Sequence, residues 1–363
     1  MDPGARPTIA VVTGSYGAGH DAVARELATR LLGTGARVTG HDVADLLACR
    51  VGPLLRWAYF RQLQTFPTTW GTTLTRLDAD NRASHTGRCV LSLLGSRLVR
   101  EVSHADLVIA THPFASQILG TARARGHLRS PVVTYLTDAS VHRFWVSAGV
   151  DLHLAIHQVA ASQARALGAS VVVIDPVVPS VGRPVLGGYW SPPWPADRRV
   201  ALVVGGSHGI GQLEQTALDV LATGLMTPVV ACGNNHRLRR RLAKCPGTMA
   251  LGWRSDLRAL MTAADCVIQN SGGMSSLEAL AGGTATLTYR PIPGHGLTNA
   301  LGLDRAGLVP YLKGMSQLKA ALSDVLTGAH RGGLPEPEPA GDCLAVITGL
   351  LRGSDSLDPE IAA

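Results

Sequence analysis

The residues with the clearest capacity for chemistry are Gly272, Gly273, Ser275, Ser276 and Glu278, which share the segment SGGMSSLEAL. The segment follows a short apolar run, and its pattern predicts a glycine turn that opens a helix. Unpaired N–H groups and the helix dipole both favour an anion at a helix N-terminus, so a phosphate can bind there without a lysine. Because Glu278 lies further along the same helix, it can reach a ribose attached to that phosphate.

The neighbouring elements follow a regular order. We expect an amphipathic helix over Asp256–Ala264, an apolar strand over Cys266–Asn270 and a second apolar strand over Ala285–Tyr289. A loop of proline and glycine then finishes at Asn299. Short apolar strands that alternate with helices are typical of a buried parallel sheet. In this setting the glycine pair indicates a nucleotide site more strongly than it would alone.

This order of motifs resembles the donor-binding half of nucleotide-sugar glycosyltransferases with the two-domain GT-B fold. The chain is most similar to monogalactosyldiacylglycerol synthases and bacterial diacylglycerol glucosyltransferases, and less so to the N-acetylglucosaminyltransferase of lipid II synthesis. The resemblance covers most of residues 8–310. It implies an α/β fold of two Rossmann-like domains facing across a cleft. It also implies an inverting hexosyltransferase that uses a UDP-sugar and a lipid acceptor such as diacylglycerol.

By this resemblance, the glycine-initiated helix holds the diphosphate, Glu278 binds the ribose and the Pro293–Asn299 loop contacts the sugar. The resemblance also implies that three further segments contact the donor: the Gly205–Gly211 loop, the Cys232–Asn235 turn and the segment around Trp253. The donor-binding residues are expected to be Gly206, Ser207, Gly209, Gly233, Asn234, Trp253, Arg254, Gly272, Gly273, Met274, Ser275, Ser276, Glu278, Gly294, His295 and Asn299.

One position departs from the family pattern. Relatives usually carry a Gln–Glu or Gln–Gln pair after the last strand, and its second member binds sugar hydroxyls. His295 and Gly296 occupy the equivalent positions here, and glycine has no side chain to bond a hydroxyl. The lost bond is typically worth ~1–3 kcal/mol of discrimination. The donor sugar therefore stays open between glucose, galactose, N-acetylglucosamine and a deoxysugar.

The first half of the chain has its own candidate site. The glycine-rich turn Gly14–His20 follows the apolar strand Thr8–Thr13, so His20 opens the next helix at the sheet edge where α/β sites form. An imidazole can take a proton from an alcohol that attacks an anomeric carbon. By the resemblance, His20 is the expected general base, or the residue that orients the acceptor hydroxyl.

Two further segments follow strands in this half. Asp138, His142 and Trp145 match a pattern that lines the cleft in the family, and His112 lies in a similar THPF loop. Asp138 orients His20, acts as the base itself, or simply caps the next helix. The expected catalytic residues are His20 and Asp138, and the expected acceptor residues are Gly17, Gly19, His112, His142 and Trp145.

Other chemistries are less favoured. The Gly205–Gly211 loop has the glycine spacing of short-chain dehydrogenases, but no tyrosine stands four residues before any of the three lysines, as their catalytic pair requires. The first glycine turn is not GxGxxG, and the strand expected over Arg37–His41 lacks an acidic end. His153 and His157 have zinc-like i, i+4 spacing but no third ligand. We therefore expect no metal and no cofactor, and the helix dipole at Gly272 is expected to stabilise the leaving group.

The chain of 363 residues is long enough for two domains. We expect an acceptor domain over 1–180, a Pro/Gly-rich linker over 181–199, a donor domain over 200–330, and a tail over 331–363 whose helix packs back. Six cysteines form no CxxC pair, and the N-terminus lacks the apolar region of a signal peptide. These features predict a cytoplasmic protein, peripheral at the inner face of the plasma membrane.

The net charge of +7 comes from 30 arginines and three lysines against 26 acids. An anionic membrane is the expected partner, because no basic helix is interleaved with aromatics as nucleic-acid binding favours. The segment 54–77 holds five of sixteen aromatics, among them Trp57, Phe66 and Trp70, mixed with arginines. Such a mixture suits a membrane interface.

Three alternatives to a lipid glycosyltransferase remain from the sequence. The first is a transferase of the same fold that modifies a soluble natural product. The second is a nucleotide-sugar 2-epimerase, which would need more acidic residues than Asp138 and Glu278. The third is a protein that binds nucleotide or membrane without catalysis.

Overall fold

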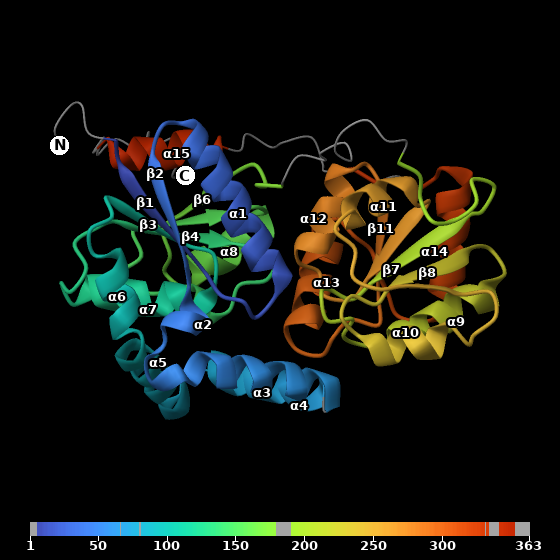
Figure 1. Cartoon of the computed structure of the whole chain (residues 1–363), viewed down its shortest axis with the longest axis horizontal. Helices are drawn as coiled ribbons and strands as arrows, with labels where there is room; N and C mark the ends of the chain where they lie inside the picture. Colours follow the sequence, from blue (N-terminus) through green and yellow to red (C-terminus); the bar gives the residue numbers. More distant parts are fainter. Residues whose placement is uncertain are drawn as a thin grey trace. The chain divides into compact units, whose positions relative to one another are not determined.

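The computed structural model describes residues 6–65, 67–79, 81–178, 190–330, 332–333 and 341–352. The chain forms two compact units (Figure 1). The first comprises Met1–Gln62, Thr69–Val177 and Pro337–Ala363, and the second comprises Leu63–Thr68 and Val178–Glu336. Residues 181–189 of the expected linker, 181–199, lie outside the described residues.

The first unit contains a parallel sheet of order β2-β1-β3-β4-β5-β6. Its strands are β1 (Thr8–Thr13), β2 (Arg37–Asp42), β3 (Leu107–Ala110), β4 (Val132–Leu136), β5 (Leu152–Ala155) and β6 (Val171–Val173). The helices of this part of the chain are α1 (Ala18–Gly33), α2 (Val43–Leu46), α3 (Val51–Thr65), α4 (Pro67–Asp78), α5 (Arg82–Leu94), α6 (Ser96–Val102), α7 (Pro113–Ala124), α8 (Gln158–Ala166) and α15 (Cys343–Leu351), with 3-10 turns η1 (Ala48–Arg50) and η2 (Arg143–Trp145).

The second unit repeats the architecture, with a parallel sheet of order β12-β11-β10-β7-β8-β9. Its strands are β7 (Val200–Val204), β8 (Thr227–Ala231), β9 (Met249–Leu251), β10 (Cys266–Gln269), β11 (Ala285–Tyr289) and β12 (Tyr311–Leu312). Its helices are α9 (Leu213–Thr223), α10 (His236–Leu242), α11 (Leu257–Ala263), α12 (Met274–Ala281), α13 (His295–Arg305) and α14 (Met315–Thr327).

Each sheet has one point where the strand order reverses, between β1 and β3 in the first unit and between β7 and β10 in the second. Loops that follow the two strands at such a point diverge to opposite faces of the sheet, and open α/β sheets bind ligands there. The loops concerned are Gly14–Gly17 and Thr111–His112 in the first unit, and Gly205–Gln212 and Asn270–Gly273 in the second.

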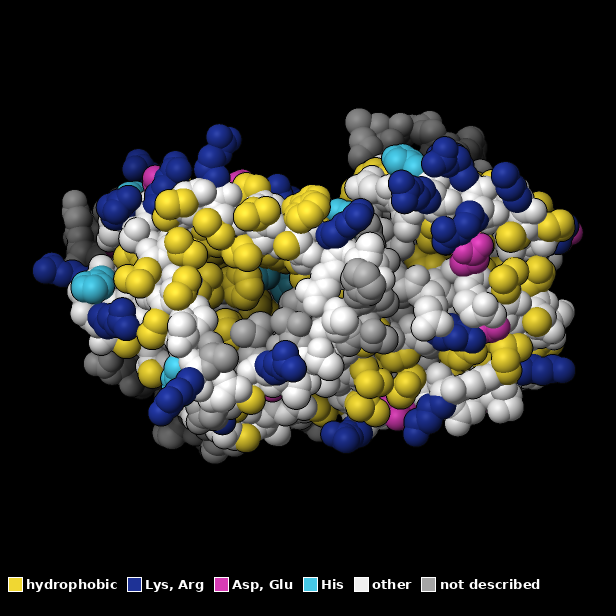
Figure 2. Space-filling model, turned by 90° about the horizontal axis from the view of Figure 1, so that it is seen from below, with side chains coloured by type: hydrophobic (Ala, Val, Ile, Leu, Met, Phe, Trp, Pro, Cys, Tyr) yellow, Lys and Arg dark blue, Asp and Glu magenta, His cyan; other side chains and the backbone are white. Residues whose placement is uncertain are grey.

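Within the described residues, no helix is both long and apolar enough to cross a bilayer. Hydrophobic side chains nevertheless gather on part of the surface (Figure 2). The exposed large ones include Leu54 and Trp57 on α3 and Val90 and Leu93 on α5. Phe66 and the side chain of Trp70, also expected at a membrane, lie outside the described residues.

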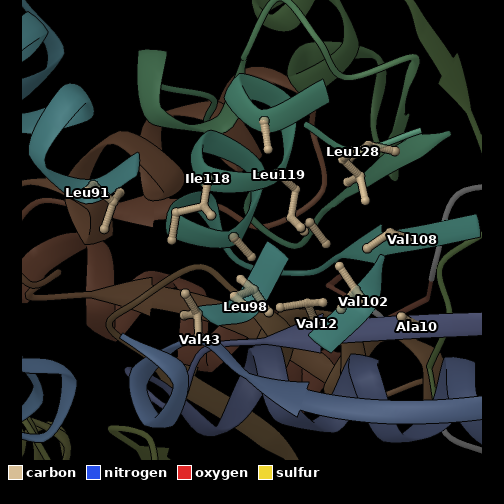
Figure 3. Close-up of a cluster of buried hydrophobic side chains, with 14 of the residues drawn as sticks. Ala10, Val12, Val43, Leu91, Leu98, Val102, Val108, Ile118, Leu119 and Leu128 are labelled. Atoms are coloured by element: carbon tan, nitrogen blue, oxygen red, sulfur yellow. The ribbon is translucent and has the colours of Figure 1, made fainter. Parts of the chain in front are cut away.

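The core of the first unit lies between the sheet and helices α5 to α7. Val12 and Val108 from the strands pack with Leu98, Ile118 and Leu119 from the helices (Figure 3). Burying such a side chain stabilises the fold by about 1.5–3 kcal/mol. The strands that carry the site loops are therefore anchored in a dry core.

The C-terminal helix α15 belongs to the first unit. Just before it, Gly341 forms a parallel bridge with Ile174 and donates its N–H to the Val173 carbonyl at 3.0 Å. Asp342 caps the helix by accepting from the Leu344 N–H at 2.9 Å. The segment thus extends the edge of the sheet beyond β6 before the helix begins.

One local prediction was wrong, and one of the alternatives for Asp138 is excluded. Strand β2 ends at Asp42, so an acidic residue does close this strand. Its carboxylate accepts from the N–H groups of Ala44 and Ser15, at 2.8 and 3.3 Å, and is therefore used in capping α2 and holding the first glycine turn. Asp138 caps no helix, because the next helical turn begins at Arg143 with His142 at its N-cap.

Candidate active site

His20 occupies the switch point of the first sheet, in the opening turn of α1. Its ring Nδ1 lies 2.9 Å from the backbone carbonyl oxygen of Thr111 and 2.9 Å from the hydroxyl of Thr137. A carbonyl can only accept, so Nδ1 carries the proton and donates it. In the neutral ring Nε2 then holds the free lone pair, which is the requirement for a general base.

His112 supports this ring. It caps α7 by accepting from the Phe114 N–H through Nδ1 at 3.2 Å, and it packs edge-on against His20 at 4.8 Å between ring centroids. Burial, reinforced by the charges of His20 and His142, holds the pKa of His112 well below its usual value. His112 is therefore a neutral packing partner, stacked on Tyr16 at 5.1 Å.

The glycine turn is shaped by this packing. A Cβ at Gly14 would lie 2.6 Å from the His112 ring, whereas one at Gly17 would meet only the His20 ring at an ordinary 3.6 Å. Gly19 lies in the first turn of α1. From α3, Arg56 donates to the Ser15 hydroxyl at 2.5 Å, so this helix also holds the turn that precedes His20.

Trp145 does not line a surface as the sequence suggested. It is fully buried in a core cluster with Leu136 and Ala155, and its ring centroid lies 6.0 Å from that of His20. Any contact with an acceptor must therefore be made by other residues, and Trp145 packs near the imidazole of His20. His142 is half-buried beside it, 6.3 Å between centroids.

Asp138 follows Thr137 at the end of β4 and is half-buried. Burial first, and then the negative charge of Asp138, raise the pKa of Tyr59. The groups that orient Nδ1 of His20 are the Thr111 carbonyl and the Thr137 hydroxyl, neither of which was expected from the sequence. Both residues directly follow a strand of the sheet, and that position is the signal that could have found them.

In the second unit, the loops after β7 and β8 interlock. A Cβ at Gly209 would lie 2.3 Å from the Cys232 carbonyl, and one at Gly233 would lie 2.3 Å from the Ser207 carbonyl, which accepts from the Asn234 N–H at 2.9 Å. Gly206, Gly209 and Gly233 all have positive φ, which favours glycine. The sequence-predicted loops are therefore brought together at one sheet edge.

The start of α12 corrects the expected phosphate site. The N–H groups of Ser271 and Gly272 donate to the side-chain oxygen of Gln269, at 2.8 and 2.5 Å, so the Gly272 amide is already used. The first-turn amides of Met274 and Ser275 remain, because no side chain caps this helix. Gly272 still needs glycine, since its φ is +68° and a Cβ would meet Asn299 at 2.6 Å.

The side chains of this helix divide by exposure. Ser275 is half-buried, whereas Met274 and Ser276 are buried. The Ser276 hydroxyl has no hydrogen-bond partner among the described residues, so only Ser275 offers a hydroxyl toward solvent. Because the Met274 side chain is buried, the backbone of this residue is what it can offer a ligand. The predicted ligand contacts of Met274 and Ser276 stay predictions.

Glu278 forms an ion pair with Arg258, whose Nε lies 3.2 Å from a carboxylate oxygen. Burial raises the pKa of Glu278, and Arg258 lowers it. Because both side chains are largely buried, the pair fixes the carboxylate in one orientation on α12. A fixed acceptor of this kind suits two vicinal hydroxyls of a ribose.

The expected sugar loop is shorter than predicted, because α13 starts at His295 with Gly294 at its N-cap in a positive-φ conformation. Asn299 is a fully buried helix residue that donates to the Ser271 carbonyl at 3.0 Å, so it holds the loop that precedes α12. A Cβ at Gly296 would lie 2.9 Å from the Asn270 carbonyl. Backbone packing thus explains glycine at this position.

Trp253 and Arg254 follow β9. Trp253 is 58% exposed, which leaves its ring and backbone accessible. Arg254 pairs with Asp256 at 2.7 Å, and Asp256 also accepts from the indole N–H of Trp190 at 2.9 Å. The hydrogen bonds from Arg254 are the main reason that the pKa of Asp256 is lowered to about 2. Arg254 is therefore committed to this pair.

This chain is similar to several known proteins. The family model of monogalactosyldiacylglycerol (MGDG) synthase matches residues 20–177. The chain is 22% identical to the processive diacylglycerol beta-glucosyltransferase of Bacillus mycoides, over 94% of this chain and 93% of that protein. The chain is a glycosyltransferase. Its predicted resemblance to these enzymes is confirmed.

Solved structures establish the fold of this glycosyltransferase. MurG of Acinetobacter baumannii aligns with a TM-score of 0.53 and 16% identity, covering 96% of this chain and 100% of that one. LpCGTa, solved in complex with UDP, aligns with a TM-score of 0.54 and 16% identity over 89% and 91% of the two chains. The predicted α/β fold with two Rossmann-like sheets, the GT-B fold, is thus confirmed.

Proposed function

We propose that this glycosyltransferase moves a hexose from a UDP-sugar to a hydroxyl of a diacylglycerol-type lipid, with inversion at the anomeric carbon. The observation that carries the proposal is the pair of contacts at Nδ1 of His20, which leaves Nε2 unprotonated at the switch point of the first sheet. The relative from Bacillus mycoides is named for diacylglycerol, which supports this lipid class.

The proposed step is a single displacement. Nε2 of His20 takes the proton from the acceptor O–H as its oxygen bonds to the anomeric carbon from the face opposite the diphosphate. The bond from that carbon to the diphosphate oxygen breaks, and UDP leaves with the electron pair. The amides at the start of α12 stabilise the negative charge on the departing diphosphate. We propose that this stabilisation replaces a metal ion.

The donor is proposed to bind the second unit. The ion-paired carboxylate of Glu278 would accept hydrogen bonds from the ribose, four residues beyond the first helical residue, Met274. The LpCGTa structure contains UDP, which favours uracil as the base. Gly296 packs against Asn270 and has no side chain that could contact the sugar. We therefore propose that residues beside Gly296 select the sugar, and His295 is the one with a polar ring.

Helix α3 is proposed as the membrane contact of the first unit. Leu54 and Trp57 are 61% and 63% exposed, one helical turn apart, whereas Arg56 points to the Ser15 hydroxyl and Tyr59 packs on Tyr16 at 6.0 Å. One face of the helix is thus apolar and open, and another holds the turn before His20. Exposed apolar patches on a helix suit a lipid interface.

The test is release of nucleotide diphosphate from a panel of UDP- and dTDP-sugars, with diacylglycerol in neutral mixed micelles and without it. Lipid-dependent release from one UDP-sugar, unaffected by a chelator, supports the proposal. Release that needs a soluble alcohol and ignores the lipid would assign a natural-product transferase instead. A His20→Ala variant provides the catalytic control, because it should bind UDP but turn over far more slowly than wild type.

A further inference from the structure

Helix α10 presents an unusually basic face to solvent. Arg237, Arg240, Arg241 and Lys244 are all exposed, and they recur at i, i+3, i+4 and i+7, which places them along one stripe of the helix and its C-terminal turn. Leu238 and Leu242 are buried and attach the helix to the core of the second unit. Basic side chains gather on this unit in Figure 2.

Repulsion between the basic side chains of this face destabilises the helix, and ion pairs within the protein offset that repulsion only in part. Like charges three or four residues apart on a helix destabilise it, each pair by about 0.2–0.5 kcal/mol, and the stripe contains four such pairs. Among the described residues, one carboxylate pairs with the stripe, that of Glu214, which accepts from Arg241 at 2.7 Å. An external anion would relieve the repulsion that remains.

The surface beside the stripe is hollow and amphipathic. A cavity of about 460 Å³ between α9 and α10 is lined by Gly209, Gly211, Gln212, Glu214, Gln215, Leu218, Asn235, Leu238 and Arg241. Leu218 is 37% exposed at this rim. Arg241 and the amide side chains of this cavity are already engaged within the protein: Glu214 accepts from Arg241, Gln212 accepts from Arg290, Gln215 donates to Asp219 and Asn235 donates to the Gly209 carbonyl. The groups that suit an anionic headgroup are therefore the basic side chains of the stripe outside that ion pair, beside the exposed Leu218.

We propose that the α10 stripe is a second membrane contact that binds anionic phospholipid headgroups. It is separate from the apolar face of α3 and lies on the donor-binding unit. The choice of lipid over other polyanions rests on the proposed function, because an enzyme that uses a lipid acceptor works at a membrane. Helix α10 also contains no Phe, Tyr or Trp for stacking on nucleobases.

The test is flotation of the full chain with phosphatidylcholine vesicles, with and without phosphatidylglycerol, at low and high salt. The variant is Arg237→Gln/Arg240→Gln/Lys244→Gln, which leaves the Arg241–Glu214 pair intact. Its matched control is Arg305→Gln/Lys313→Gln/Lys319→Gln, which removes three exposed charges elsewhere on the same unit. The stripe variant should partition to anionic vesicles roughly 100-fold more weakly than wild type, and the control nearly as wild type.

Equal losses in the two variants would overturn the proposal, because net charge alone would then explain binding. Wild-type binding that ignores phosphatidylglycerol, or a stripe that prefers single-stranded RNA to these vesicles, would also overturn it. Turnover in neutral diacylglycerol micelles separates this proposal from the enzymatic one. Both variants should keep wild-type turnover there, and failure of the wild type in that assay would reject the proposed function while leaving the vesicle result to stand.

Discussion

Nδ1 of His20 lies 2.9 Å from the carbonyl oxygen of Thr111, a residue 91 positions away in the sequence. The contact joins the loops that follow β1 and β3, the two strands at the reversal of the first sheet. Because both loops start from buried strands, the imidazole is held by the sheet itself. A backbone acceptor also cannot be lost by mutation, so the tautomer of His20 is built into the fold.

His20→Ala should lower kcat by about 100- to 10,000-fold, the usual contribution of a general base, and leave UDP affinity within a few-fold of wild type. Turnover and isothermal titration of UDP check the two parts. Asp138→Asn is the comparison, since the sequence left Asp138 as the other candidate base. If the Asp138 variant loses activity and the His20 variant keeps it, the assignment must be reversed.

Thr137→Val removes the second acceptor at Nδ1 while nearly preserving volume at a buried position. Losing one such hydrogen bond, worth about 1 kcal/mol, should reduce kcat roughly fivefold and leave the KM for the nucleotide sugar unchanged. Thr137→Ser keeps the hydroxyl and should restore the rate. A KM effect without a kcat effect, or no rescue by serine, would show that Thr137 does not position the base.

Glu278→Gln should weaken UDP binding roughly 10- to 100-fold and change kcat less, because a neutral amide is a poorer acceptor for ribose hydroxyls. Arg258→Gln breaks the same ion pair from its other side and serves as the control for a purely structural effect. Titration of UDP and thermal unfolding should be measured on both. Equal losses of affinity and of Tm in the two variants would argue that Glu278 only supports the fold.

Burial lowers the pKa of His157 from 6.5 to about 4. The unfolded chain therefore binds a proton at this site between about pH 6.5 and 4 that the folded chain does not, so the free energy of unfolding should rise with pH across that window. Urea unfolding at several pH values between 4 and 7 measures this slope. His157→Gln should reduce it, and an unchanged slope would mean that other groups dominate.

Much of the fold follows from local sequence, because each parallel strand is a short apolar run with no competing pattern. Strands β1 and β11 have the bounds that the sequence predicts, Thr8–Thr13 and Ala285–Tyr289. The error in β2 has a physical cause, since this edge strand is half-exposed and its polar end, His41 and Asp42, gives no apolar signal. Edge elements depend on tertiary contacts that sequence periodicity does not report.

The candidate site was predictable in position more than in detail. Glycine turns after strands located the loops around His20 and Gly272, but not the side chains that form hydrogen bonds with these loops. Gln269 takes the Gly272 amide, and Thr137 reaches His20 across 117 residues. The contact of Thr137 depends on which strands become neighbours in the sheet, which one sequence read in order cannot specify.

The interlocked glycines of the second unit constrain how this enzyme could be re-engineered. A side chain at Gly209 would collide with Cys232, and one at Gly233 would collide with Ser207. The two loops therefore pack so closely that each restricts the residues of the other. A donor loop transplanted alone from another glycosyltransferase would collide with its unaltered neighbour. A chimera should therefore fold only when Gly205–Gly211 and Cys232–Asn235 are exchanged together. For the same reason, substitutions in one loop should be accompanied by substitutions in the other among natural relatives.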